Sequence, residues 1–158
     1  MEKMFDRCES LTSLNISTFN TENVTCMVSM FWKCKSLEEL NLSNFKTGKV
    51  ENMSGMFCNC HSLKILDVSN FNTEKVTNMI EMFHNCKSLE NLDLKSFNIK
   101  NVNQMLGIFS DCESLTKLDL SNFDTKHLDE INWLFSGCIK LKKNNVITKD
   151  ERILKTFD

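Results

Sequence analysis

Cysteine and histidine are the residues of this sequence best suited to chemistry, with eight cysteines and three histidines in 158 residues. At that density, a zinc site or a disulfide framework has to be considered first. Zinc sites need close ligand pairs such as C-x-x-C, and the one close pair here is Cys58 and Cys60, with His61 adjacent. Cys60 belongs to a regular, inward-facing column, so its side chain should point away from that of Cys58. We therefore expect no metal site and no cofactor.

Six of the cysteines recur at one position of a 26-residue unit, which indicates a structural role. Stacking in register brings such cysteines near disulfide distance, but parallel Cα–Cβ vectors are poor geometry for a bridge. Reduced core thiols are the favoured interpretation, although cysteines are usually paired in extracellular proteins. Cys26 and Cys58 fall outside the column, and we expect both at solvent positions with no disulfide bond between them. At such positions sequence drift explains a cysteine; a reactive thiol is the alternative. The column consists of Cys8, Cys34, Cys60, Cys86, Cys112 and Cys138.

The sequence offers no constellation for catalysis. His61, His84 and His127 occupy different positions of the repeat, with no shared nucleophile or orienting carboxylate, and no phosphate-binding loop or HExxH motif occurs. We therefore expect no enzyme activity. A net charge of −2 gives no basic field for nucleic acid, and no apolar run is long enough for membrane insertion by this segment.

The 26-residue period extends to most apolar residues, and a fixed period overrides any segment-by-segment interpretation. Phenylalanine stands three residues before each cysteine of the column, and leucine stands three residues after it. No insertion or deletion interrupts the register through Leu141. We predict one repeat domain over residues 1–141, with an incomplete first coil, followed by a degenerate C-terminal cap over residues 142–158.

Each unit contains two periodicities. Val76, Met79, Met82, Phe83 and Cys86 fall on one face of a helix, and the threonine three residues before Val76 stands at the N-cap position. The following Leu89-x-x-Leu92-x-Leu94 alternates like a strand, with Leu92 and Leu94 inward. We predict an α/β fold: a leucine-rich-repeat-like solenoid with one short parallel strand and one helix per coil, in about five to six coils.

The two ends of the repeat array differ. Residues 148–157 are expected to form a short amphipathic helix, in which Ile153, Leu154 and Phe157 cover the last core layer. At the N-terminus nothing comparable covers Met4 and Phe5. That end is therefore expected to follow another domain or to pair with another chain, which makes end-to-end self-association a further hypothesis.

The pattern resembles the leucine-rich repeat signature L-x-x-L-x-L, found here as Leu115-x-x-Leu118-x-Leu120. More closely, Met82-Phe83-x-x-Cys86-x-Ser88-Leu89-x-x-Leu92-Asp93-Leu94-x-x-Phe97 resembles the BspA-like repeat of bacterial surface proteins, first noted as a mycoplasma domain of unknown function. The resemblance extends from about Met4 to Leu141. It differs from ordinary leucine-rich repeats because phenylalanines such as Phe97 occupy the usual position of an asparagine ladder. It implies cell-surface or secreted display, with contacts to other proteins, such as adhesion, and no enzyme activity.

Repeat solenoids usually bind through outward side chains of successive coils, so the strand side is the candidate protein-binding face. This face stacks three aspartates in one column. A solvated polar surface is favoured there over a cation site, because a flat ladder of carboxylates offers too few oxygens that converge on one point. Trp32, on an outward column, is the better aromatic anchor, since Trp133 should pack against the tail; a partly buried surface tryptophan is an equally plausible interpretation of Trp32. The candidate residues are Glu39, Asn41, Ser43, Ile65, Asp67, Ser69, Asn91, Asp93, Lys95, Lys117, Asp119, Ser121 and Trp32.

The sequence therefore favours a non-enzymatic protein-protein interaction module of a surface-displayed repeat protein, with adhesion or partner binding as its role. The alternative is a structural spacer or assembly repeat without a specific ligand. The partner's identity stays open. A cell-surface or secreted location follows from the family resemblance alone, and a cytoplasmic location is the alternative, because the sequence contains no signal peptide.

Overall fold

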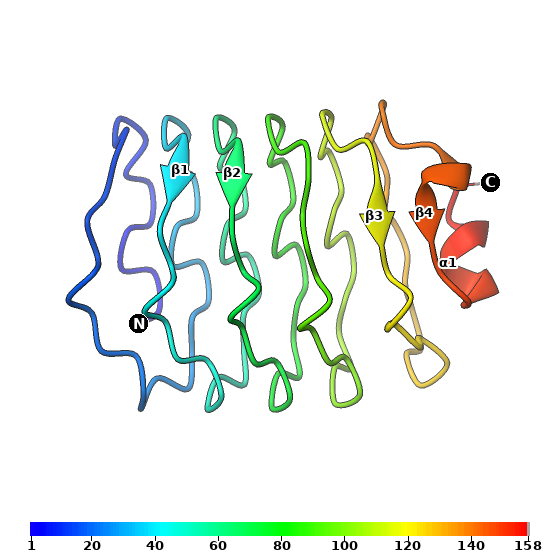
Figure 1. The fold of residues 1–158 in the computed structure, drawn as a ribbon, viewed down its shortest axis with the longest axis horizontal. Coiled ribbons are helices and arrows are strands. Elements are labelled where there is room, and N and C mark those ends of the chain that lie inside the picture. Colours follow the sequence, from blue (N-terminus) through cyan, green and yellow to red (C-terminus); the bar gives the residue numbers. More distant parts are fainter. Residues whose placement is uncertain (158) are drawn as a thin grey trace.

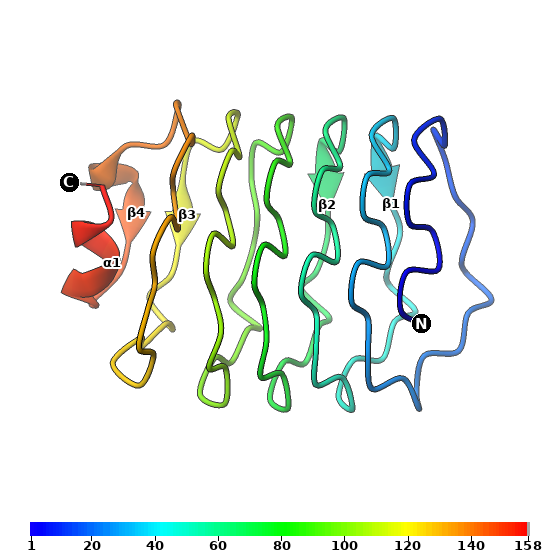
Figure 2. The ribbon, with the colours of Figure 1, turned by 180° about the vertical axis from the view of Figure 1, so that it is seen from behind.

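The computed structural model describes residues 1–157 and shows a solenoid whose coils stack along one axis (Figure 1). Regular secondary structure is sparse, and most of each coil consists of turns and extended segments. One face carries the short strands, and the opposite face is a series of regular bends (Figure 2). The elements are β1 (Glu39–Leu40), β2 (Ile65–Leu66), β3 (Leu118–Asp119), a 3₁₀ helix η1 (Lys143–Asn145), β4 (Val146–Ile147) and α1 (Glu151–Lys155).

The strands form two parallel pairs, β1 with β2 and β3 with β4. Glu39 aligns with Ile65, as the 26-residue period requires, whereas Leu118 aligns with Val146, two positions beyond that period. The repeat register therefore continues beyond Leu141 after a two-residue insertion at η1. The predicted alternation of side chains is confirmed in the segment between β2 and β3, where Leu92 and Leu94 are buried and their neighbours are exposed.

That segment between β2 and β3 is nevertheless not hydrogen-bonded as a strand. Within residues 1–157, the backbone N–H groups of Asn91, Leu92 and Asp93 donate to no acceptor in the protein. The parallel ladder of the strand face is thus interrupted at this coil. The protein itself therefore supplies no acceptor for these three N–H groups, of which two belong to exposed residues, Asn91 and Asp93.

The prediction of one helix per coil is wrong. In residues 1–157 the single α-helix is α1, and the segment from Met27 to Cys34 is a chain of turns. Two positions of each coil adopt the left-handed conformation, which no α-helix tolerates. They form two columns with the 26-residue period: Lys3, Ser29, Gly55, Glu81, Gly107 and Trp133, and Arg7, Lys33, Asn59, Asn85, Asp111 and Gly137.

The turns reproduce helical spacing without a helix. The N–H of Met30 donates to the carbonyl of Met27 (3.3 Å), and the N–H of Cys34 donates to that of Phe31 (3.1 Å). Each pair closes one turn, and one turn follows directly on the other. Met27, Met30, Phe31 and Cys34 therefore all point inward and are buried, as they would on a helix face.

A continuous hydrogen-bond ladder runs along the face on which helices were expected, which we call the turn face. The N–H groups of Met27, Ser29, Phe31 and Lys33 each donate to a carbonyl of the next coil at 2.9 Å. The same positions repeat the pattern in later coils, for example from Phe57 to Met82. At these four positions the donors point towards the C-terminal end, whereas just before them Glu51 and Thr77 donate back to the preceding coil, to the carbonyls of Thr25 and Glu51.

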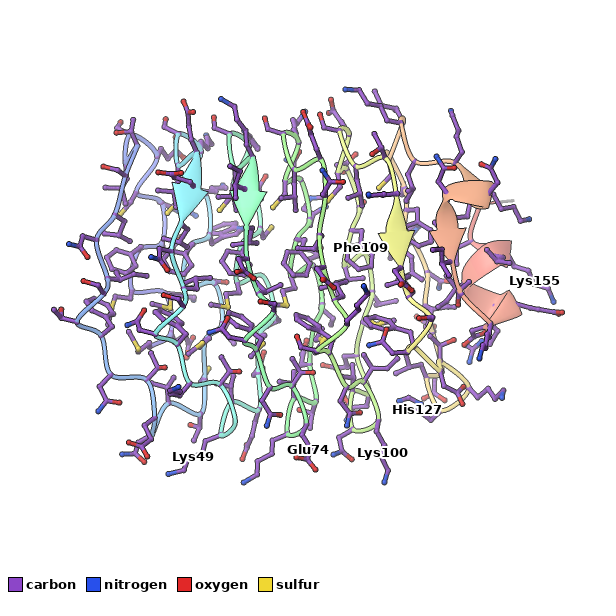
Figure 3. All side chains as sticks on the ribbon, in the orientation of Figure 1. Lys49, Glu74, Lys100, Phe109, His127 and Lys155 are labelled. Carbon is purple, nitrogen blue, oxygen red and sulfur yellow. The ribbon has the colours of Figure 1, made fainter. Side chains whose placement is uncertain are left out.

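The core is built from columns of identical side chains. Phe31, Phe57 and Phe83 are buried, and their rings stack with centroids 5.6 and 5.7 Å apart and planes within 5°. Figure 3 shows Phe109, which continues this stack, pointing into the interior of the solenoid. Such burial of apolar area between neighbouring coils is the main stabilising term in a repeat protein.

The threonines expected as helix caps have another role. Thr47 is buried, its hydroxyl donates to the carbonyl of Asn72 (2.9 Å) and it accepts from the N–H of Asn72 (2.8 Å). Thr21 and Thr73 repeat these two bonds with the next coil. The N-cap prediction is wrong because no helix begins there; the hydroxyl joins adjacent coils at a turn instead.

An asparagine ladder is present, one residue before the phenylalanine column. The side-chain Nδ2 of Asn70 donates to the carbonyls of Leu42 (2.9 Å) and Phe45 (3.1 Å) in the preceding coil. Asn44 and Asn122 make equivalent bonds. The phenylalanines thus do not replace the asparagine ladder, as the repeat pattern suggested; the two columns lie side by side.

The tail closes the C-terminal end of the solenoid. The short helix expected there is present as α1, with Ile153 fully buried and the Phe157 ring stacked on Phe135 at 4.7 Å. Asp150 accepts from the N–H and the hydroxyl of Thr125, both at 2.6 Å, and caps α1 through the N–H of Arg152 (2.9 Å). One carboxylate thereby joins the tail to the coil before it.

We expect Gly137→Ala to destabilise the protein by more than about 2 kcal/mol, from the left-handed strain together with a steric clash. Gly137 has φ of 73°, and an added Cβ would lie 3.2 Å from the Cα of Asp111 and closer still to its side chain. Gly107→Ala is the matched control, because it shares the conformation but meets nothing closer than 3.7 Å. Urea unfolding of both variants measures the difference; an equal destabilisation of both would contradict the clash.

Candidate functional site

The candidate binding residues lie where the sequence placed them, on the outward side of the strand-bearing segments, with the exception of Trp32. We call this surface, formed by the outward side chains of residues 39–43, 65–69, 91–95, 117–121 and 145–147, the strand face. Eleven of its twelve predicted residues are exposed, and Asp119 is half-buried. The structure thus assembles them on one side of the solenoid.

The carboxylates and amide of the middle column are held by local turns. Asn41, Asp67, Asp93 and Asp119 each accept a hydrogen bond from the N–H two residues later, at 2.9–3.0 Å. Hydrogen bonds from the Ser69 side chain and backbone lower the pKa of Asp67, and those from Ser121 lower the pKa of Asp119 in the same way. Asp67 and Asp119 are therefore charged near neutral pH, and the hydrogen bonds fix the orientation of all four side chains.

An open groove crosses the strand face at the interrupted coil and has a volume of about 730 Å³. Exposed apolar side chains stand at its two ends: Ile65, which is 67% exposed, and Ile147, which is 60% exposed. Between them the groove is polar, with cations and fixed carboxylates on adjacent coils. Its other lining residues include Asp67, Asn91, Asp93, Lys95, Lys117, Asp119 and Asn145.

Sequence reasoning missed Ile147 because the two-residue insertion at η1 shifts the register. As a result of this shift, Ile147 aligns with Asp119 and so enters the strand face. The β-branched pair Val146–Ile147 after two asparagines was the available signal for a further strand.

Of the two tryptophans, Trp32 matches the partly buried alternative, whereas Trp133 is not packed against the tail as expected. Trp32 is half-buried, the guanidinium of Arg7 and the ammonium of Lys33 lie 5.1 and 4.3 Å from its ring, and its Nε1–H donates to Cys58 Sγ (3.2 Å). Trp133, expected to pack against the tail, is 66% exposed. Its left-handed backbone, with φ of 57°, directs the side chain outward. Trp133 is therefore the accessible aromatic residue.

The column cysteines act as hydrogen-bond donors in the core. The Sγ of Cys60 and that of Cys86 lie 3.1 and 3.2 Å from the carbonyls of Phe31 and Phe57 in the preceding coil. Burial raises the pKa of both thiols well above the ordinary value, so they stay protonated and can donate. Cys8, in the first coil, is exposed.

The expectation that Cys58 is near solvent is wrong. Cys58 is 2% exposed, because Trp32 and Asn59 cover its sulfur and donate to it. Burial raises the pKa of the Cys58 thiol to about 11, which makes it a poor nucleophile at neutral pH. Cys26 is half-buried.

The histidines are dispersed and make structural contacts. His61 Nε2 lies 3.1 Å from Asn85 Nδ2, and burial, with Lys87 and Lys35 nearby, lowers the pKa of His61. His127 Nε2 lies within 3.0 Å of two backbone carbonyls at the turn of the adjacent coil. Over the described part of the chain, no three histidine, cysteine or acidic side chains gather as metal ligands.

The 26-residue coils, the inward leucine columns and the asparagine ladder define a leucine-rich-repeat solenoid. The chain belongs to the family described as "Mycoplasma protein of unknown function, DUF285", whose model matches residues 1–66 and 59–151. The family resemblance inferred from the sequence is thereby confirmed. No curated protein matches the chain.

Two solved structures are similar to this chain. A leucine-rich repeat protein from Bacteroides ovatus shares 19% identity and a TM-score of 0.46, over 90% of this chain and 39% of its own. A leucine-rich cell surface protein from Faecalibacterium prausnitzii shares 22% identity and a TM-score of 0.43, over 82% of this chain and 38% of its own. The chain thus spans about two fifths of each protein's length. No helix within residues 1–157 is long and apolar enough to cross a bilayer.

Proposed function

We propose that this chain is a non-enzymatic protein-interaction module and that the groove between Ile65 and Ile147 is its principal contact surface. The observation that carries the proposal is the groove itself: two exposed apolar side chains flank a segment whose backbone N–H groups are unpaired. Exposed isoleucines do not stabilise the solenoid, whereas apolar anchors surrounded by polar groups are typical of protein interfaces.

An extended segment of a partner protein suits this groove. The unpaired N–H groups of the exposed residues Asn91 and Asp93 offer donors to backbone carbonyls, and the fixed carboxylates beside Lys95 and Lys117 offer charged contacts on both sides. From β2 to β4 there are three coil steps, and Ile147 lies two residues further along the strand than Ile65, so the two are roughly 16 Å apart, which an extended segment covers in about five residues. Apolar side chains separated by that length of segment would therefore reach both isoleucines.

Panning a random peptide library against the protein tests the proposal. We expect selected ligands to bind the double variant Ile65→Ser with Ile147→Ser at least about tenfold more weakly, because both anchors are lost. Ile139→Ser is the matched control, since Ile139 is 66% exposed but does not line the groove. Ligands that bind all three proteins equally would contradict the proposal.

Display at the cell surface, with adhesion as the biological role, is part of the same proposal and is supported by the resemblance of the repeat to the BspA-like repeat of bacterial surface proteins. A binding face of this kind suits a protein that binds its partner without catalysing a reaction. Protease accessibility of the native protein on intact source cells tests this part: cleavage at the surface is expected, and protection until lysis would contradict it.

A further inference from the structure

Gly48 is the one glycine of the described chain that the backbone does not require. The other three glycines adopt the left-handed conformation, whereas Gly48 does not. It is the second residue of a tight turn, closed by the N–H of Val50, which donates to the carbonyl of Thr47 (2.9 Å). The corresponding turns of the neighbouring coils have Glu22 and Glu74 at this position. The turn therefore accommodates a long side chain, and the absence of one at Gly48 is not a property of the fold.

A hollow with a volume of about 650 Å³ lies at Gly48. A Cβ added there would meet one atom within 4 Å, the Nδ2 of Asn72 at 3.7 Å, which is an ordinary van der Waals distance. A side chain at this position would thus fit, and it would occupy part of the hollow. Figure 3 shows the edge of the solenoid concerned, from which Lys49, Glu74 and Lys100 project.

Two asparagine amides of the hollow are fixed by local turns. The Oδ1 of Asn20 accepts from the N–H of Glu22 (3.0 Å), and the Oδ1 of Asn72 accepts from the N–H of Glu74 (2.9 Å). Within residues 1–157, the Nδ2 of neither asparagine donates to an acceptor. Each amide is therefore held in place by its oxygen and presents two N–H donors that the protein does not use.

The hollow also carries charges of both signs. Lys46 and Glu22 line it, both are exposed, and neither makes an ion pair within the described residues. Lys49, by contrast, is held because its Nζ donates to the Oδ1 of Asn23 (2.7 Å). The half-buried ring of Phe19 adds an apolar surface.

These groups suit a neutral ligand with several hydroxyl groups. An anion would face the carboxylate of Glu22, and a cation would face the ammonium of Lys46. An apolar ligand would leave the amide of Asn72 without acceptors. A hydroxyl group both donates and accepts, so it can pair with groups of either kind. A sugar carries several hydroxyls on a rigid ring whose C–H groups can also contact Phe19.

We propose that the hollow at Gly48 is a saccharide-binding site. Hydroxyl groups of the sugar donate to the carboxylate of Glu22 and accept from Lys46 and from the amides of Asn20 and Asn72. Glycine at position 48 leaves room for the ring. The hollow shares no lining residue with the strand-face groove, so the site does not rest on the proposed function.

Saturation-transfer difference NMR with the methyl glycosides of glucose, galactose, mannose and N-acetylglucosamine tests the site. We expect saturable binding of at least one glycoside, weakened at least about tenfold in Gly48→Gln because the new side chain occupies the hollow. Lys46→Met should weaken binding several-fold. Lys100→Gln is the matched control, because it introduces the same residue at the same turn position outside the hollow, and it should bind like the wild type.

Gly48→Gln should leave the Tm unchanged or raise it, because glycine has the greater conformational freedom in the unfolded chain. A lower Tm would show that the fold requires Gly48 and would overturn the proposal. No saturable binding of any of the four glycosides, or equal binding by wild type and Gly48→Gln, would also overturn it. Inorganic phosphate that binds the wild type but not Gly48→Gln, without binding of a glycoside, would do the same by assigning the hollow to an anion.

A mannose-rich glycopeptide distinguishes the two sources of such a sugar. If it binds more tightly than methyl mannoside and loses this advantage in Gly48→Gln, the site takes a sugar unit of a protein-linked glycan. Equal binding of glycopeptide and methyl mannoside, again lost in Gly48→Gln, assigns the site to a free sugar.

Discussion

Replacing Phe57 by alanine is expected to lower the free energy of unfolding by about 3–5 kcal/mol, the usual cost of removing a buried aromatic ring. Phe57 has no exposed surface and stacks on Phe31 and Phe83 at 5.6 and 5.7 Å. Each coil touches only its neighbours, so a cavity here weakens two interfaces at once. Chemical denaturation followed by circular dichroism measures the destabilisation.

Phe5→Ala is the matched control. Phe5 belongs to the same stack but is half-buried, with its ring centroid 5.5 Å from that of Phe31. We expect it to cost less than half as much as Phe57→Ala. A destabilisation below about 1 kcal/mol for Phe57→Ala would show that the column is not the core.

Asp150→Ala is expected to lower the free energy of unfolding by about 2–3 kcal/mol, because it leaves the buried N–H and hydroxyl of Thr125 without their acceptor and removes the cap of α1. The substitution removes two hydrogen bonds of 2.6 Å from Thr125 and one of 2.9 Å from Arg152. Asp124→Ala is the control, since Asp124 is exposed and accepts one local N–H at 3.2 Å.

The contribution of Asp150 should also depend on pH. Burial by itself raises the pKa of this carboxyl, but the hydrogen bonds from Thr125 and Arg152 outweigh it and hold the pKa below the ordinary value of 3.8. The folded protein therefore binds this proton less readily than the unfolded chain does. The stability difference between wild type and Asp150→Ala should be largest above that ordinary value and shrink as the pH falls through the folded pKa. A difference that does not shrink in acid would contradict this assignment.

The core of this fold follows from the sequence because one period governs it. The 26-residue register assigns Leu92, Leu94 and Cys60 to the interior, and all three are buried. The helix prediction fails because apolar residues at intervals of three and four are compatible with successive tight turns as well as with a helix. Gly107 and Gly137, which recur in left-handed columns, were the residues that distinguish the two.

The candidate site is less predictable because it depends on interruptions of the repeat. Ile147 enters the strand face only through the two-residue insertion at η1, and the groove lies over the segment at Leu92, which is not part of the hydrogen-bonded ladder. Neither the insertion nor the missing hydrogen bonds can be recognised from the residue types at one position of the 26-residue repeat. The exposure of Trp133 follows from a backbone conformation that sequence alone assigns only where glycine is present.

Amide hydrogen exchange, measured with and without a ligand selected on the wild-type protein, tests the proposed binding face most directly. In the free protein, the amides of Asn91, Leu92 and Asp93 should exchange rapidly, because they donate to no acceptor in the protein. Ligand binding should slow these three amides and leave the turn-face ladder unchanged. Protection confined to the turn face, with rapid exchange persisting at residues 91–93, would contradict the assignment of the groove as the binding surface.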